Sequence, residues 1–263
     1  MRNSLLNESI LDEIRKIRPR TVEFLYSAGK DSSLAVLITR DAIRELRDEL
    51  GFDVYMVYIL IPGNTHPLNA YAAALVMEWH KEHYGFETIY ACREKVMQDL
   101  AKRYGFQIGP NRWCFSEFKR EVFTSIDRRM KRPILKINGM SPKDSTLRME
   151  VVEAELQYID SKGAVPYYSW TPLFSLDLSS KEKLDILRKH KEFEPVVWLY
   201  DKFGDSMNCI YCPYKSKDKI SALHRVEDMT VVKMFIDRFI TSEKVKKSVS
   251  GVSNMSLADF GIL

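Results

Sequence analysis

The residues best suited to phosphate chemistry form one short segment, Ser27-Ala28-Gly29-Lys30-Asp31-Ser32-Ser33. A glycine lets the backbone approach a ligand closely, and serine hydroxyls can donate hydrogen bonds to phosphate oxygens. Lys30 can supply a positive charge, and Asp31 can orient a magnesium ion or cap a helix. We therefore take Lys30 and Asp31 as the candidate catalytic residues and the whole segment as a candidate phosphate-binding loop.

The elements on either side of this loop have the arrangement that binds anions. Residues 21–26 read as a short buried strand, and residues 32–50 carry apolar side chains at helical spacing. A helix that starts after a strand brings several backbone N–H groups and the positive end of its dipole to one point. The spacing matches neither the Walker loop nor the dinucleotide-binding fingerprint. An ordinary turn with a helix cap is the alternative interpretation.

The rest of the chain alternates strands and helices. Residues 53–61 form a near-continuous β-rich run, as expected of a central parallel strand. The helices are expected at residues 4–18, 68–84, 94–104, 116–131 and 179–189, and further strands at 87–91 and 133–138. This order predicts an α/β fold with a doubly wound, Rossmann-like parallel sheet. Adenine is then expected at the carboxyl end of the second strand, near Tyr58, Ile59 and Leu60.

Beyond residue 139 the chain changes character, with an indeterminate segment to residue 161 and an aromatic-rich stretch at 165–174. We therefore expect two regions, a nucleotide-binding core over residues 1–150 and a smaller C-terminal region over 151–263 packed on the same body.

The composition of the chain argues against a membrane-spanning or secreted protein. Of the 263 residues, 45% are hydrophobic, and no run approaches the roughly 18 uninterrupted apolar residues of a membrane span. The first 20 residues mix charges into a helical pattern, unlike a secretory signal, so we expect a cytoplasmic protein without membrane partners. A net charge of +4 permits an anionic substrate. A tRNA or other nucleic-acid acceptor and a homodimer both stay open.

Several segments together resemble one known family. The loop from Ser27 to Ser32 looks like the Ser-Gly-Gly-Lys-Asp-Ser loop of the adenine nucleotide α-hydrolases, or PP-loop ATP pyrophosphatases, with Ala28 in place of the first glycine. It is closest to the loop of the PAPS reductase-like group. Residues 62–67 are similar to that group's Thr-Gly-x-x-Phe-Pro segment, and residues 138–148 to its Gly-x-Arg-x-x-x-Ser-x-x-Arg segment. The resemblance implies nucleotide contacts by Asn64, Thr65, Gly139, Ser145 and Arg148.

This resemblance also implies an activity. The leading expectation is an enzyme that binds ATP with Mg²⁺, cleaves it at the α-phosphate with release of pyrophosphate, and adenylates an acceptor, with sulfur transfer as one purpose. The alternatives are a reductase of PAPS or adenylyl sulfate and a non-catalytic nucleotide-binding accessory protein with a structural zinc. The reductases proper use a cysteine in a C-terminal Glu-Cys-Gly-x-His segment, and residues 242–263 contain no cysteine.

Cysteine spacing predicts a metal site. Cys209 and Cys212 form a Cys-x-x-Cys pair, and Cys114 can supply a third thiolate. Three thiolates suit a 4Fe-4S cluster with one open iron, or a zinc ion completed by another ligand. Cys92 is a possible fourth ligand, although a cysteine at a strand end is more often part of the core. His80 and His83 share one helix face, which we interpret as a solvated face rather than a metal pair.

Overall fold

The computed structural model describes residues 7–105, 113–141 and 152–210 of the chain. These residues divide into two compact units, each made of separate chain segments. The first contains residues 7–58, 71–91, 123–141 and 152–198, and the second contains 59–70, 92–105, 113–122 and 199–210. The expected boundary at residue 150 falls within residues 142–151, outside the described part, and stays a prediction.

A six-stranded sheet of order β3-β2-β1-β4-β6-β5 forms the core of the first unit. Its strands are β1 (Thr21–Tyr26), β2 (Asp53–Leu60), β3 (Glu87–Cys92), β4 (Ile134–Asn138), β5 (Leu156–Ile159) and β6 (Tyr167–Trp170). The central strand β1 pairs in parallel with β2 and β4, and β4 pairs in parallel with β6. The edge strand β5 runs antiparallel to β6. The α/β, Rossmann-like class is thus confirmed, with one antiparallel edge added to the parallel sheet expected from the sequence.

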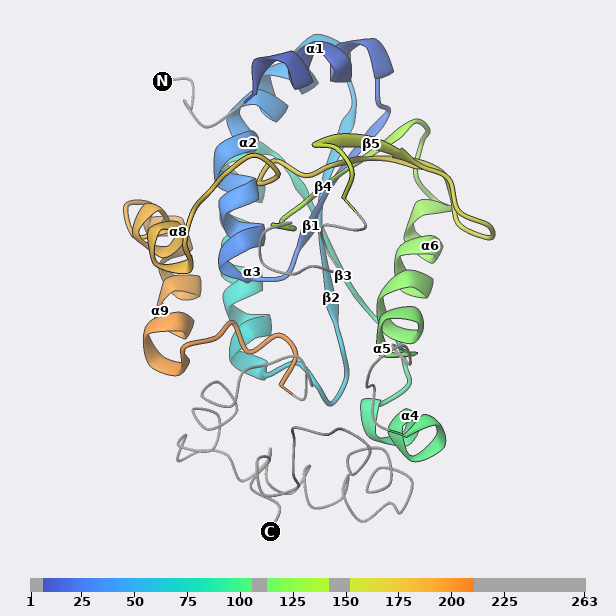
Figure 1. Ribbon diagram of the computed structural model, residues 1–263, viewed down its shortest axis with the longest axis vertical. Helices are drawn as coiled ribbons and strands as arrows, with labels where there is room; N and C mark the ends of the chain where they lie inside the picture. The colour runs from blue at the N-terminus through green and yellow to red at the C-terminus, as the bar shows by residue number, and fades with distance from the viewer. Residues whose placement is uncertain (1–6, 106–112, 142–151, 211–263) are drawn as a thin grey trace. The chain divides into compact units, whose positions relative to one another are not determined.

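Helices cover both faces of this sheet. They are α1 (Glu8–Ile17), α2 (Lys30–Leu50), α3 (Pro67–Tyr84), α6 (Glu121–Asp127), α8 (Ser180–Leu187), a 3₁₀ turn η3 (Lys191–Phe193) and α9 (Glu194–Phe203). Figure 1 shows α2 on one side of β1 and β2 and α6 on the other side. Leu34, Ile43 and Leu46 of α2 are fully buried, as the apolar face of a covering helix must be.

The second unit contains α4 (Met97–Tyr104) and a helical segment that begins at α5 (Trp113–Phe115). The expected continuous α-helix over 116–131 is wrong in its detail. Ser116–Arg120 forms a π-helical turn, η1, in which the Glu121 amide donates to the Ser116 carbonyl, and α6 ends at Asp127. The side chain of Arg93, which lies outside this helix, donates a hydrogen bond to the Glu117 carbonyl oxygen of the turn at 2.9 Å.

A buried ionic cluster lies between β1, β4 and α6. Lys136 Nζ lies 2.6 Å from Asp127 Oδ1 and 3.4 Å from Glu23 Oε2, and Glu23 is 0% exposed. The rings of Phe123 and Tyr167 lie about the ammonium group, with centroids 5.0 and 4.7 Å from Nζ. Burial raises the pKa of Glu23 to about 7, against the opposing effect of Lys136.

The interpretation of His80 and His83 as one solvated face is wrong for His80. Its ring is fully buried, Nδ1 lies 2.7 Å from the Val76 carbonyl, and Nε2 lies 3.2 Å from Arg40 Nη1. Burial lowers the pKa of His80 to about 4, so the neutral ring accepts from the arginine. The helical pattern alone could not reveal that Arg40 of α2 would cover this side of α3.

Within residues 7–105, 113–141 and 152–210, no helix is both long and apolar enough to cross a membrane.

Candidate functional site

The loop between β1 and α2 has a backbone shape suited to an anion. Gly29 is the N-cap of α2, with extended φ and ψ of −92° and 156°. Ala28 before it has φ of 51°, in the left-handed region, and its methyl group is fully buried. A non-glycine residue pays about 1 kcal/mol for this conformation. A glycine would avoid this cost, and Ala28 meets it with the smallest side chain that carries a Cβ atom.

Ser32 organises the loop from within the first turn of α2. Its Oγ lies 3.0 Å from Ser27 Oγ, donates to the Gly29 carbonyl oxygen at 3.0 Å, and accepts from the Gly29 amide at 3.3 Å. The neighbouring Ser33 is buried, and its hydroxyl lies 3.1 Å from the Tyr26 hydroxyl. In this geometry the hydroxyl groups of Ser32 and Ser33 hold the shape of the loop. The first amides of α2 have no acceptor within the helix, so contact between these amides and a phosphate stays a prediction.

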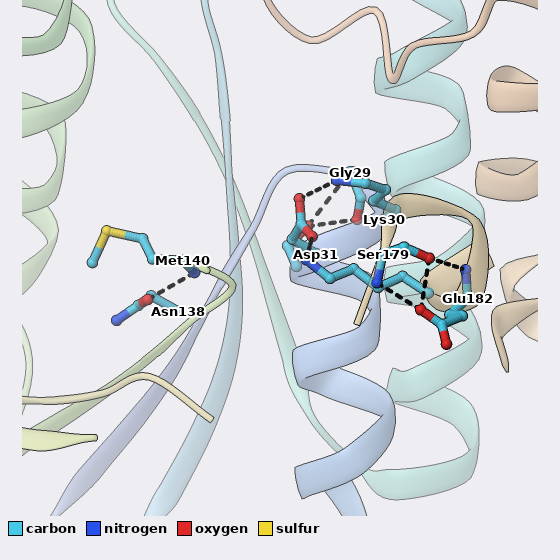
Figure 2. A network of polar contacts seen from close by, with 9 residues as sticks. Gly29, Lys30, Asp31, Asn138, Met140, Ser179 and Glu182 are labelled. Carbon is cyan, nitrogen blue, oxygen red and sulfur yellow. Dashed lines mark hydrogen bonds and ion pairs between the residues drawn. The ribbon is translucent and has the colours of Figure 1, made fainter. Parts of the chain in front are cut away.

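Two lysines hold the carboxylate of Asp31. Lys30 Nζ lies 2.7 Å from Asp31 Oδ2, and Lys183 Nζ lies 2.9 Å from Asp31 Oδ1. Figure 2 shows Lys30 and Asp31 at the start of α2, facing the first turn of α8. Nothing in the sequence indicates that Lys183 belongs to this site, because it comes 152 positions after Asp31; in the structure it is only 1% exposed.

A capping box places Lys183 next to the loop. Ser179 is the N-cap of α8, its Oγ accepts from the Glu182 amide at 3.2 Å, and its own amide donates to Glu182 Oε2 at 2.8 Å. This reciprocal pair fixes where α8 begins and therefore which residue faces α2. The Ser-x-x-Glu pattern was visible in the sequence, but the packing of α8 against α2 was not.

The environment of Asp31 favours its ionised form. Burial raises the pKa of the carboxyl group, but the ammonium groups of Lys30 and Lys183 more than offset this effect, so the pKa of Asp31 lies below its usual value. Both carboxylate oxygens have an ammonium partner. A cation at Asp31 would have to displace a lysine from the carboxylate, and the expectation that Asp31 orients a magnesium ion stays a prediction.

The segment after β4 packs directly on this helix start. A Cβ atom on Gly139 would lie 2.4 Å from the Ser32 amide nitrogen, so only glycine fits. Asn138 holds the turn in place, because its Oδ1 accepts from the Met140 amide at 2.9 Å (Figure 2). Its Nδ2 is 3.0 Å from both Ser169 Oγ and Thr171 Oγ1. The predicted contacts of Ser145 and Arg148 lie outside the described residues.

The residues expected near adenine belong to different units and differ in burial. Tyr58 belongs to the first unit, pairs with Tyr26 across β1 and β2, and is 2% exposed. Its ring packs edge-on against Tyr90 at 6.4 Å between centroids. Ile59 and Leu60 belong to the second unit, and Leu60 is the more exposed of the two. Their contacts with adenine stay a prediction.

Within the second unit, the turn that follows β2 is joined to residues 206–210. Thr65 Oγ1 accepts from the Ile61 amide at 3.0 Å, and the Asn64 carbonyl accepts from the Ile210 amide at 2.8 Å. Asn69 Nδ2 donates to the Ser206 carbonyl at 2.7 Å. The structure thus brings the segment of Asn64 and Thr65 next to the segment of Cys209, which the sequence did not predict.

The structure describes some, but not all, of the cysteines of the predicted metal site. Cys114 and Cys209 are half-buried cysteines of the second unit, and Cys209 Sγ lies 3.4 Å from Asn208 Oδ1. Cys92 is exposed at the end of β3, so the idea that it belongs to the core is wrong. Cys212 lies outside the described residues. Among those that the structure does describe, no three His, Cys, Asp or Glu side chains are grouped as metal ligands. A site of Cys114, Cys209 and Cys212 stays a prediction.

Comparison with known proteins finds similarity among solved structures. No protein-family model and no curated protein sequence matches the chain. Among solved structures, the chain is similar to FMN adenylyltransferase of Candida glabrata, crystallised with FMN and the ATP analogue AMPCPP. The sequences are 15% identical and the TM-score is 0.39. The similarity covers 66% of this chain and 50% of that enzyme, so the chain spans about half the length of the enzyme it matches.

Proposed function

We propose that the chain binds ATP, or a related adenine nucleotide, with its phosphates at the start of α2, and that it is a PAPS reductase-like PP-loop enzyme that cleaves ATP at the α-phosphate. One observation carries this proposal. The loop from Ser27 to Ser33 combines a helix N-terminus, a glycine N-cap and a lysine-rich ion cluster at one point. Backbone amides and ammonium groups in this arrangement are the donors that phosphate oxygens require.

The proposed reaction develops negative charge on the leaving pyrophosphate, and the loop carries groups that can stabilise this charge. A nucleophile of the acceptor attacks the α-phosphorus, the bond from that phosphorus to the bridging oxygen breaks, and pyrophosphate leaves with the electron pair. The departing pyrophosphate gains negative charge, which the first amides of α2 and the Lys30 ammonium stabilise. Asp31 keeps that ammonium in place. The contribution of these groups is positioning and charge stabilisation rather than proton transfer.

Nucleotide contacts by Asn64, Thr65, Gly139, Ser145 and Arg148 complete the proposed site. Of these residues, Gly139 lies at the loop itself, since its backbone packs against the backbone of Asp31 and Ser32. An iron–sulfur or zinc site on Cys114, Cys209 and Cys212 would add sulfur chemistry to nucleotide activation, with a tRNA or another nucleic acid as one class of acceptor.

Binding and product analysis test the proposal. Isothermal titration with ATP, AMP, PAPS and adenylyl sulfate identifies the preferred ligand. Incubation with ATP labelled at the α-phosphate then separates two outcomes, because cleavage at that phosphate yields AMP or an adenylated product together with pyrophosphate, whereas cleavage at the γ-phosphate yields ADP. Release of sulfite from PAPS would favour a reductase. Binding of ATP without turnover would favour an accessory role.

A further inference from the structure

Lys183 is a buried charge next to the loop, and the proposed function gives it no role. It lies one turn into α8, is 1% exposed, and contacts Asp31 Oδ1 at 2.9 Å. A buried lysine is costly unless it is paired, so its position calls for a reason. Its ammonium group cannot readily reach solvent, which argues against direct contact with a ligand and in favour of an effect through Asp31.

Two ammonium groups lie against the single carboxylate of Asp31. Lys30 Nζ is 2.7 Å from one carboxylate oxygen, and Lys183 Nζ is 2.9 Å from the other. The ammonium group of Lys183 adds positive charge near the positive end of the dipole of a 21-residue helix. Lys183 therefore makes the start of α2 more favourable for a phosphate.

The same contact determines which cation neutralises Asp31. A carboxylate beside phosphates is a usual ligand for a magnesium ion. Here each oxygen of Asp31 already has a lysine partner, and the one on Oδ1 comes from the protein interior. A divalent cation brought to Asp31 would also be repelled by two ammonium groups close by.

We infer that Lys183 is a positioning residue that takes, at Asp31, the place of a divalent cation, so that the loop binds the phosphates of a nucleotide without a metal ion held by Asp31. The inference rests on the proposed nucleotide site and deepens it. Lys183 keeps Asp31 ionised and engaged, and Asp31 in turn holds the Lys30 ammonium at the helix start. The phosphates then interact with Lys30 and with the first amides of α2.

Titration of ATP into four proteins tests this inference, in EDTA and again in excess Mg²⁺. They are the wild-type chain, Lys183→Met, Lys183→Arg and the control Lys181→Met, which changes an exposed lysine of the same helix. We expect the wild type to bind ATP in EDTA and Lys183→Met to bind about tenfold to a hundredfold more weakly. Mg²⁺ should restore part of the loss in Lys183→Met, because Asp31 is then free to take the cation. Lys183→Arg and Lys181→Met should stay near wild type.

The outcomes separate this inference from the proposed function. If the wild type binds ATP in neither condition, the proposed function fails and the inference fails with it. If the wild type binds and Lys183→Met binds equally well in EDTA, only the inference is overturned. The same holds if the wild type binds ATP solely with Mg²⁺.

A second measurement covers the case in which Lys183→Met does not fold. Mn²⁺ added to the nucleotide-free wild type should leave the amide NMR signals of residues 30–33 unbroadened, since Lys183 and Lys30 occupy Asp31. Selective broadening of those signals would show that a divalent cation binds there and would overturn the inference.

Discussion

The backbone of Gly139 lies against the backbone of Ser32, so closely that a Cβ atom on Gly139 would be 2.4 Å from the Ser32 nitrogen and 2.5 Å from its Cα. These two residues are more than a hundred positions apart, and they bring the end of β4 onto the start of α2. The candidate site is therefore shaped by the carboxyl ends of two neighbouring parallel strands, β1 and β4.

Gly139→Ala should displace the loop. The added methyl group meets backbone atoms that cannot rotate away, so we expect a loss of about 1–3 kcal/mol in the free energy of unfolding, with ATP binding weakened as well. Urea denaturation and calorimetric titration measure the two effects. Gly51→Ala is the matched control, because Gly51 ends the same helix with φ of 74° and open space around it. That variant should lose stability from backbone strain yet keep its affinity for ATP.

Lys30→Ala should impair nucleotide binding more than folding. Asp31 keeps Lys183 as a partner when Lys30 is removed, so the unfolding free energy should change by about 1 kcal/mol. The affinity for ATP should fall about tenfold to a hundredfold, because a charge-assisted contact to phosphate is lost. Lys189→Ala, at an exposed lysine, serves as the control. Normal binding and turnover by Lys30→Ala would make Lys30 a surface charge without a role at the site.

Glu23 should make the stability of the chain depend on pH. Burial raises the pKa of its carboxyl group from the usual 4.5 to about 7, with Lys136 opposing the shift and Asp127 adding to it. A raised pKa in the folded state favours folding below pH 4.5, and this contribution is lost as the pH rises to about 7.

Comparison with Glu23→Gln isolates that effect. The unfolding free energy of the wild type relative to the variant should fall by up to about 3 kcal/mol between pH 4.5 and 7 and then level off. Chemical denaturation at several pH values provides the measurement. A difference that stays constant with pH would mean that Glu23 is ionised throughout in the folded protein.

The cysteine prediction is open to metal analysis. Chain purified without oxygen should contain iron with sulfide, or zinc, and Cys114→Ser or Cys209→Ser should abolish the bound metal. Loss of one thiolate from three removes most of the affinity of such a site. Cys92→Ser is the informative comparison, because Cys92 is an exposed thiol. If it too loses metal, Cys92 is a fourth ligand. Metal retained by Cys114→Ser would exclude Cys114 from the site.

Local patterns predicted most of the fold because each element carries its own signal. The buried strand before Ser27 and the helical spacing after it depend on neighbouring residues, and the structure bears them out. The short strands β5 and β6 were not predicted, since four residues hold too little periodicity to distinguish a strand from a loop.

The missed parts of the site depend on contacts between distant segments. Nothing near Lys183 in the sequence indicates that it faces Asp31, because the packing of α8 on α2 decides this. Asn138 stood within the segment that resembled the family, yet its role in holding Ser169 and Thr171 required the neighbouring strand β6. In both cases the role of a polar residue depends on a partner that is distant in the sequence and is brought close only by the fold.

The ionic cluster of Glu23 and Lys136 also constrains how the sheet assembles. In the native register Glu23 lies beside Lys136. A slip of one residue would turn Lys136 to the other face of the sheet, and a slip of two would set Glu23 beside Ile134 or Asn138. Either leaves a charge buried without its partner, at a cost of several kcal/mol. Apolar neighbours such as Val22 and Ile137 would stay buried in a two-residue slip, so they do not distinguish the two registers. The pairing of Glu23 with Lys136 does, and it therefore favours a single register of the central strands.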